Sequence, residues 1–202
     1  MVPEIPADDS RSDDLASELK QFWALLARGV ADKRSHFNTP TLGTIAGDGT
    51  PAQRTVVLRA CRPSCRELEF HTDARSAKIA EIANSAAVGW HVWDPRTSLQ
   101  LRISSRARTH RGDTVAEAAW DRLHPGSRAI YAQSASPGAP ITDRQAAATD
   151  RVSDAEAYRH FVCVVTTATR LERLHLSKDG HRRTVWDWDH TGQTWTAVAV
   201  AP

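Results

Sequence analysis

Apolar residues near the N-terminus recur at intervals of three and four. The positions are Leu15, Leu19, Phe22, Trp23, Leu26 and Val30. Side chains at this spacing lie on one face of an α-helix, so the pattern predicts a helix over residues 15–31 with one buried face. We expect this helix to cover a sheet, because the pattern changes to that of strands soon after it.

Most of the remaining chain has the short, β-branched and alternating segments typical of strands, separated by glycine-containing turns. Predicted strands span residues 41–46, 53–60, 68–72, 87–93, 99–110, 161–168, 171–176, 183–188 and 195–200, with short helices at 76–83 and 113–123. So many antiparallel strands favour a closed or nearly closed barrel, because closure removes exposed sheet edges. The predicted fold class is therefore mainly β, a β-barrel with peripheral helices.

The chain length suits one domain. At 202 residues, of which 41% are hydrophobic, it is long enough for one well-buried core and short for two. Residues 1–12 are polar, acidic and contain proline, which predicts a flexible N-terminal tail before a single domain over 13–202. Residues 128–149 are rich in alanine, serine, proline and glycine, which predicts a long surface or interface loop.

Charge and cysteine usage narrow the function classes. Lys and Arg total 26 against 24 Asp and Glu, and the net charge of +2 predicts no general attraction to nucleic acid or membranes. The three cysteines form no disulfide framework and no signal-peptide pattern is present, so we expect a soluble, cytoplasmic protein. Cys61 and Cys65 lack a second ligand pair at zinc spacing, and we expect no metal site.

Two segments suit an anion. Arg54-Thr-Val-Val-Leu-Arg59 has the composition of a strand with an arginine at each end, and His71-Thr72 leads to Ser76 and Lys78 at the start of a predicted helix. A helix N-terminus offers unpaired N–H groups and a partial positive charge, both of which favour phosphate. The alternative is an ordinary hairpin with solvated arginines. Dinucleotide, nucleoside triphosphate and zinc protease motifs are absent.

These segments, taken with Gln100-Leu-Arg102 and His181-Arg-Arg183, resemble the flavin-binding series of the pyridoxamine 5'-phosphate oxidase family over roughly residues 35–202. The resemblance implies a split β-barrel, FMN as cofactor, and a homodimer with two flavins at the subunit interface. It also implies an FMN-dependent oxidoreductase, in which a hydride passes to or from flavin N5 on an unidentified small substrate.

Individual site residues follow from the same resemblance. The implied cofactor-binding residues are Arg54, Thr55, Val56, Val57, His71, Thr72, Ser76, Lys78, Gln100 and Arg183. Arg54, Ser76 and Lys78 would hold the flavin phosphate, and His71 takes the position of a family tyrosine. Ala77 replaces a family arginine, a loss for which Arg75 could partly substitute. Arg183 would contact flavin from the partner subunit.

The substrate residues are retained less well. The resemblance places Arg59, Ser127 and His181 where the family oxidase holds pyridoxamine phosphate, but the paired arginines of the phosphate clamp are missing. A bidentate arginine contact is what fixes such a phosphate, so the flavin site is kept and the vitamin site is not. No catalytic residue is assigned. Two alternatives remain: a non-catalytic flavin or haem carrier on the same barrel, and a structural dimer with an emptied site.

The tryptophans invite a structural interpretation. Trp90, Trp93, Trp186, Trp188 and Trp195 lie in predicted strands. We expect alternation to put them on one face of the barrel, where they pack in the core rather than stack on a ligand.

Overall fold

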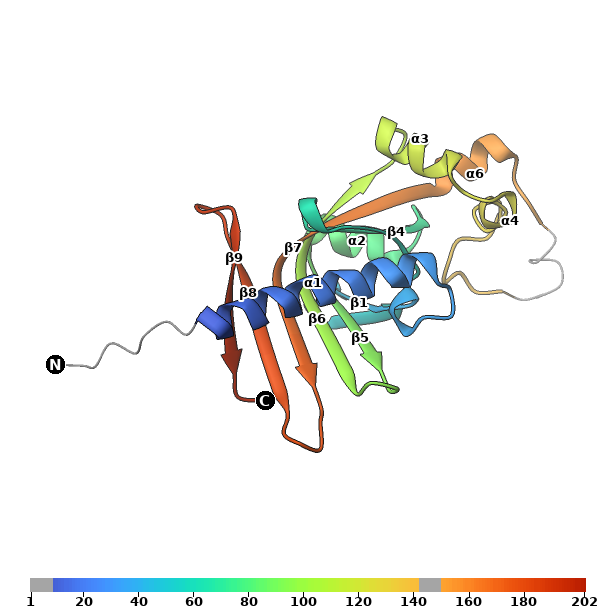
Figure 1. The fold of residues 1–202 in the computed structure, drawn as a ribbon. Coiled ribbons are helices and arrows are strands. Elements are labelled where there is room, and N and C mark those ends of the chain that lie inside the picture. The colour runs from blue at the N-terminus through green and yellow to red at the C-terminus, as the bar shows by residue number, and fades with distance from the viewer. Residues whose placement is uncertain (1–8, 142–149) are drawn as a thin grey trace.

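The N-terminal helix lies across one face of a large antiparallel sheet (Figure 1). The computed structural model describes residues 9–141 and 150–202, so the predicted tail falls mostly outside the described residues, as do residues 142–149 of the predicted loop. Helix α1 (Asp9–Ala31) contains the predicted helix and buries Phe22, Trp23 and Leu26. Phe22 meets Trp186 edge-on, with ring centroids 6.0 Å apart. The periodicity of the apolar positions thus located this helix and its buried face.

The sheet contains nine strands, and each observed pair is antiparallel. The strands are β1 (Thr41–Ile45), β2 (Pro51–Thr55), β3 (Leu58–Arg62), β4 (Glu67–Asp73), β5 (Ala87–Asp94), β6 (Leu99–His110), β7 (Phe161–His175), β8 (Arg182–Asp189) and β9 (Thr194–Val200). Their order is β2-β1-β5-β6-β7-β4-β3, with β8 paired to β7 and β9 paired to β8. The predicted mainly β fold with peripheral helices is confirmed.

Strand β7 connects the two parts of the sheet. Its first half, Phe161 to Thr167, pairs with β4, and its second half, from Arg170, pairs with β8. Both halves pair with β6 on the other edge, across a register shift at Ser104 and Ser105. The sequence predicted two strands here, and that is wrong. Thr169 is the extra residue of a β-bulge, because Ala168 and Arg170 pair with consecutive residues of β6. The polar residues next to it in the sequence resemble the end of a strand.

The predicted strand over residues 53–60 is also wrong, because the chain leaves one strand and enters another at Val56 and Val57. The Val56 N–H still donates to the Pro40 carbonyl at 3.0 Å, but proline has no N–H to donate in return, so the pairing with β1 ends there. Consequently β2 pairs with β1, whereas β3 pairs with β4. Among the described residues, β2 and β3 do not pair with each other, so the sheet is not closed by hydrogen bonds as a barrel would be.

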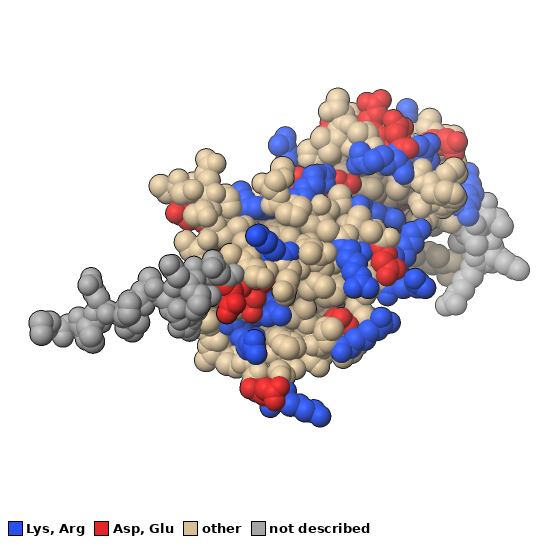
Figure 2. Space-filling view, viewed as in Figure 1, with Lys and Arg blue, Asp and Glu red and all other residues tan. Residues whose placement is uncertain are grey.

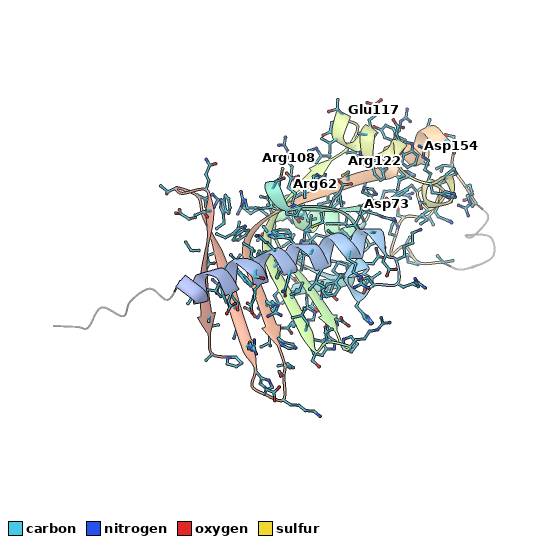
Figure 3. The ribbon with its side chains drawn as sticks, viewed as in Figure 1. Arg62, Asp73, Arg108, Glu117, Arg122 and Asp154 are labelled. Atoms are coloured by element: carbon cyan, nitrogen blue, oxygen red, sulfur yellow. The ribbon has the colours of Figure 1, made fainter. Side chains whose placement is uncertain are left out.

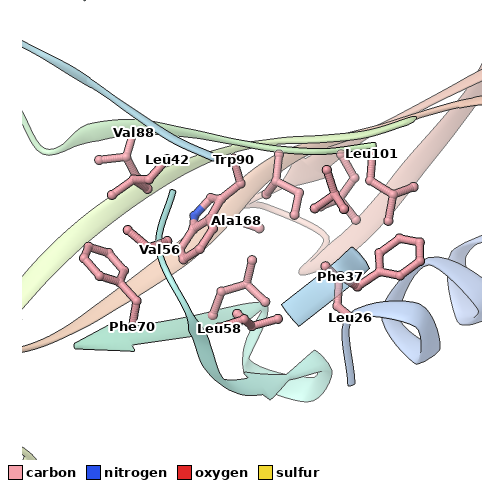
Figure 4. Close-up of a cluster of buried hydrophobic side chains, with 14 of the residues drawn as sticks. Leu26, Phe37, Leu42, Val56, Leu58, Phe70, Val88, Trp90, Leu101 and Ala168 are labelled. Carbon is pink, nitrogen blue, oxygen red and sulfur yellow. The ribbon is translucent and has the colours of Figure 1, made fainter. Parts of the chain in front are cut away.

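Two 3-10 helices, η1 (His36–Asn38) and η2 (Pro63–Cys65), and four short α-helices complete the described chain. The α-helices are α2 (Ala77–Asn84), α3 (Thr114–Asp121), α4 (Pro125–Arg128) and α6 (Asp154–His160), and the sequence did not predict the last two. The last three lie together at one end of the molecule (Figure 1). They bury a second apolar cluster around Phe161, separate from the main core between α1 and the sheet. Figure 4 shows part of that main core, including Leu26, Trp90 and Leu101. No helix in the described ranges is long and apolar enough to cross a membrane.

The tryptophans do not share one face. Trp90 and Trp186 are buried, but Trp93 is 41% exposed. Because side chains alternate along a strand, residues three apart on β5 point to opposite faces. Trp188 and Trp195 are half-buried and pack on each other, with ring centroids 5.3 Å apart. The prediction of core packing therefore holds for Trp90 and Trp186 and is wrong for Trp93.

Candidate functional site

A cavity of about 350 Å³ lies where β4, the start of α2 and the β2–β3 connection meet the segment after α4. Its walls gather most of the residues predicted for the flavin, which come from two stretches of sequence, and a third stretch completes the lining. The lining consists of Thr55, Val56, Val57, Arg59, His71, Thr72, Asp73, Ser76, Lys78, Ile130, Tyr131 and Pro137. The fold thus brings together the two segments that suggested an anion site.

One end of the cavity is built for a negative charge. The Lys78 ammonium donates to the Thr72 hydroxyl at 3.0 Å and to the Ser76 hydroxyl, at the N-terminus of α2. Burial lowers the pKa of Lys78, and the nearby Arg54 guanidinium lowers that pKa further. In the described part of the chain no carboxylate lies within ion-pair distance of Lys78. A phosphate would supply the missing counter-charge, so these residues fit the phosphate of a flavin nucleotide.

Arg54 stands behind this end of the cavity rather than on its wall. Its guanidinium forms an ion pair with Glu81 at 2.6 Å and donates to the Thr44 hydroxyl. Burial alone would raise the pKa of Glu81, but hydrogen bonds from Thr44 and Arg54 and the charges of Arg54 and Lys78 hold it below its ordinary value. The positive charge of Arg54 therefore acts on the anion end from behind the wall, and its ion pair with Glu81 weakens that effect.

Arg75 has a different role from the one expected of it. Its guanidinium holds Asp73 through contacts of 2.7 and 3.0 Å, and donates to the carbonyls of Ser134 and Gln133 at 2.8 and 2.9 Å. These contacts tie the segment after α4 to the end of β4. Because its donors are committed, Arg75 does not replace the cation that Ala77 removes.

Among the predicted substrate residues, Arg59 alone lines the cavity. It lies near Tyr131. Burial raises the pKa of the Tyr131 hydroxyl to about 12, and the charge of Arg59 opposes that rise. Ser127 belongs to α4, and His181 is exposed just before β8. Within one chain, Ser127 and His181 are not on the cavity wall.

Gln100 and Arg183 also lie away from the cavity, in one cross-strand row through Leu174. Arg183 forms an ion pair with Glu172 at 3.0 Å, and its Nε is buried without a hydrogen-bond partner in the described structure. The neighbouring Thr184 and Arg173 contact Glu18 of α1, so alternation puts Arg183 on the opposite face of the sheet. That face carries the exposed Trp93.

A buried charge network adjoins the cavity, and the sequence did not predict it. The side chain of Glu69 is 2% exposed, and its Oε1 lies 2.9 Å from His71 Nε2. Arg62 and Arg122 also lie within ion-pair distance of the Glu69 carboxylate. In Figure 3, Arg62 and Arg122 lie on the side of the sheet that α3 covers. Cys163 pairs with His71 across β4 and β7. These residues are far apart in sequence, and alternation at Glu69 and His71 was the one available signal.

On the face of the molecule shown in Figure 2, charged side chains do not form large patches of one sign. Acidic and basic side chains are interspersed over α1 and the helical end on this face. Together with the net charge of +2, this distribution leaves local clusters, such as the one at Lys78, to attract an anion.

Comparisons with known proteins agree with this geometry. Residues 19–111 match the family described as pyridoxamine 5'-phosphate oxidase, FMN-binding domain. The Arabidopsis thaliana protein named pyridoxine/pyridoxamine 5'-phosphate oxidase 2 is 30% identical over 135 residues, which cover 61% of this chain and 67% of the relative. The chain therefore belongs to the pyridoxamine 5'-phosphate oxidase family of FMN-binding domains.

Solved structures show the same fold. A pyridoxamine 5'-phosphate oxidase-related, FMN-binding protein from Nostoc punctiforme PCC 73102 aligns with a TM-score of 0.74 and 23% identity, over 89% of this chain and 96% of its own. PhzG from Burkholderia lata 383, solved in complex with tetrahydrophenazine-1-carboxylic acid, aligns with a TM-score of 0.68 and 20% identity, over 100% of this chain and 98% of its own. The family match ends at residue 111, so the role of Arg183 remains a prediction.

Proposed function

We propose that this protein is an FMN-dependent oxidoreductase whose cofactor phosphate binds at Lys78. The observation that carries the proposal is a half-buried lysine with no carboxylate within ion-pair distance in the described structure, held by two hydroxyls at a helix N-terminus and beside a cavity. Glu81 and Asp73 act on its charge only from beyond that distance, so a phosphate in direct contact with the ammonium would be favoured. The family to which the chain belongs supplies the identity of that anion.

The remaining residues of the cavity would position the ring system. Thr55, Val56 and Val57 offer a backbone strand end and apolar side chains, and Arg59 offers a guanidinium. Bound FMN would supply hydride acceptance, and the protein would orient the ring, exclude water and place the substrate against it. Arg54 would support the phosphate through its positive field, weakened by Glu81.

We also propose that the functional unit is a homodimer with the cofactor at the subunit interface. The sheet face opposite α1 leaves Trp93 and Ile45 41% and 42% exposed, and Gln100 and Arg183 lie on the same face. Trp93 pairs in register with Gln100, so a partner subunit that covered this exposed tryptophan would also reach Gln100. A partner subunit there would bring Gln100 and Arg183 toward a cavity that they do not line in their own chain.

The substrate is proposed to be a small molecule other than pyridoxamine phosphate. Arg59 is the one predicted substrate cation on the cavity wall, and a phosphate dianion is usually held by paired, bidentate arginines. A second candidate function is oxidation of a vitamin B6 phosphate, which the name of the Arabidopsis relative favours. The carboxylic acid bound by PhzG is a ligand class that a single arginine can hold.

Cofactor binding is tested by adding FMN to purified protein and measuring absorbance and affinity. Wild type should bind FMN, and Lys78→Gln should weaken binding roughly 10- to 100-fold, as expected for one charge-assisted contact. Lys33→Gln, which removes an exposed lysine, is the matched control. Failure of the wild type to bind FMN would overturn the proposal, and a red haem-containing protein would favour the carrier alternative.

Substrate choice is tested on the FMN-loaded protein with pyridoxamine phosphate and pyridoxine phosphate. Slow turnover of both is expected, because binding and turnover each depend on the missing cations. Rapid oxidation of either compound would establish the vitamin B6 phosphate oxidase instead.

A further inference from the structure

His71 connects the cavity to the buried network behind it. Its side chain is 5% exposed and lines the cavity. One ring nitrogen, Nε2, lies 2.9 Å from a Glu69 oxygen, whereas Nδ1 is buried and has no hydrogen-bond partner in the described structure. The ring is held edge-on by Phe161, with centroids 4.9 Å apart. His71 thus combines a held imidazole ring, a place on the cavity wall and a ring nitrogen without a partner in the described structure, which makes it a candidate for chemistry.

The surroundings of His71 decide its hydrogen-bonding state. Burial alone would raise the pKa of Glu69, but the hydrogen bond and charge of His71 and the charges of Arg62 and Arg122 hold that pKa below its ordinary value. Glu69 is therefore a carboxylate, which only accepts hydrogen bonds, and Nε2 must carry the proton. In the neutral ring this leaves Nδ1 as an unpaired acceptor.

A metal ion suits this cluster poorly, although Glu69, His71 and Cys163 offer ligand atoms within 4.8 Å of one another. The two arginines already neutralise Glu69 and would repel a cation. Burial and the neighbouring Glu69 together raise the pKa of Cys163 to about 12, so its thiolate is not readily available. The arrangement instead resembles the carboxylate–imidazole pairs that fix a histidine for proton transfer.

We propose that His71 exchanges a proton through Nδ1 with the ligand in the cavity, and that Glu69 is the positioning residue that fixes its tautomer. The identity of the ligand rests on the proposed function. In a two-electron oxidation, the O–H or N–H bond beside the donor carbon of the substrate breaks, and its proton forms the Nδ1–H bond. The hydride leaves that carbon with its electron pair for the bound cofactor, so the substrate is oxidised and the cofactor reduced.

The charge that forms on His71 in this step is accommodated by the same network. Glu69 on β4 faces the new imidazolium directly and stabilises it. Arg62 on β3 and Arg122 after α3 prevent Glu69 from taking the proton itself, and Cys163 on β7 stays neutral.

The first test is made on the protein without added cofactor, so it does not depend on the proposed function. Nitrogen-15 NMR of the imidazole should show the Nε2–H tautomer of His71 at neutral pH, and Glu69→Gln should populate both tautomers. Glu67→Gln, which changes an acid on the same strand outside the direct contact with His71, should leave the tautomer unchanged. A neutral ring protonated on Nδ1 in the wild type would overturn the proposal.

The second test uses FMN as the probe. On FMN addition the Nδ1 resonance should shift, and the flavin absorbance should depend on pH, because the proposed proton exchange changes the charge of the ring beside the cofactor. His71→Asn places an amide near the Nδ1 position but cannot titrate, and His71→Phe removes both functions. Loss of the pH-dependent change in both variants, with binding retained better in His71→Asn, is expected.

The outcomes separate the two claims. If FMN binds and His71→Asn and His71→Phe keep the wild-type pH dependence, the proton-exchange role is wrong while the proposed function stands. If wild type does not bind FMN, the proposed function fails, and the tautomer measurement still decides whether Glu69 fixes His71. If the ring tautomer does not depend on Glu69, the positioning role is wrong in either case.

Discussion

Arg75 and Asp73 form a two-contact ion pair, and the same guanidinium holds the carbonyls of Gln133 and Ser134. This single side chain therefore ties the segment that carries Ile130, Tyr131 and Pro137 to the strand that carries His71. The consequence is that one wall of the cavity depends on a residue that does not touch the anion end.

Replacing Arg75 should loosen that wall. Arg75→Ala removes several charge-assisted hydrogen bonds, each worth on the order of 1.5–3 kcal/mol before compensation by water, and leaves Asp73 without its partner. Hydrogen exchange of residues 130–137 should become faster, with little change in the core strands. Arg75→Lys should restore the charge but not the protection, because an ammonium cannot reach four acceptors at once. Unchanged exchange in Arg75→Ala would refute this account.

Arg54 and Glu81 should behave as a coupled pair in FMN binding. Arg54→Ala removes a cation near Lys78 and leaves the Glu81 carboxylate uncompensated beside the proposed phosphate. We expect FMN affinity to fall by about 1.5–3 kcal/mol and to recover partly in the Arg54→Ala, Glu81→Ala double variant. Calorimetric titration of the four proteins measures the coupling. Equal losses in the single and double variants would show that Glu81 has no effect.

The pH dependence of FMN binding should report on Lys78. Burial, with the Arg54 charge, lowers the pKa of Lys78 from its ordinary value. The protonated form favours the phosphate, so affinity is complete below the lowered pKa and declines as pH rises through it, beginning at a lower pH than for an ordinary lysine. Fluorescence titrations from pH 7 to 10 should show this decline in wild type and a flatter curve in Lys78→Gln. Parallel curves would exclude Lys78 as the phosphate ligand.

FMN should strengthen the proposed dimer through Arg183. A ligand that binds only the dimer tightens it by linkage. In sedimentation at decreasing protein concentration, FMN should move wild type toward the dimer, and Arg183→Ala should weaken that effect. The control is Arg182→Ala, because Arg182 is an exposed neighbour that alternation turns to the other side of β8. A monomer that binds FMN with full affinity would contradict both the interface and the role of Arg183.

The sequence predicted elements well where one local rule decided them. Helix α1 followed from the spacing of Phe22 and its neighbours, and β6 from the alternation along most of its length. It failed where a partner elsewhere in the chain decided the outcome. Val56 ends a strand because of Pro40, and Thr169 continues one because β6 accommodates a bulge. Neither cause is visible within the segment itself.

The candidate site divides in the same way. Thr72, Ser76 and Lys78 lie within seven residues and were recognised together, and the fold joined them to Thr55, Val56 and Val57. The network around Glu69 was missed, because Arg62, Arg122 and Cys163 come from β3, the end of α3 and β7. The sequence suggested that Arg75 could partly replace the missing phosphate cation, because nothing in the sequence indicated that its guanidinium would donate to the carbonyls of Gln133 and Ser134 in a distant loop.

The pairing of the first half of β7 with β4 has a consequence for synthesis of the protein. His71 and Thr72 on β4 pair in register with Cys163 and Val162 on β7. The ribosome adds these β7 residues about ninety residues after their β4 partners. Until then, the edge of β4 that carries these two residues lacks its neighbour. The β4 edge beside the ligand cavity therefore stays unpaired until the start of β7 has been made, and a nascent chain released before then would expose that edge to aggregation.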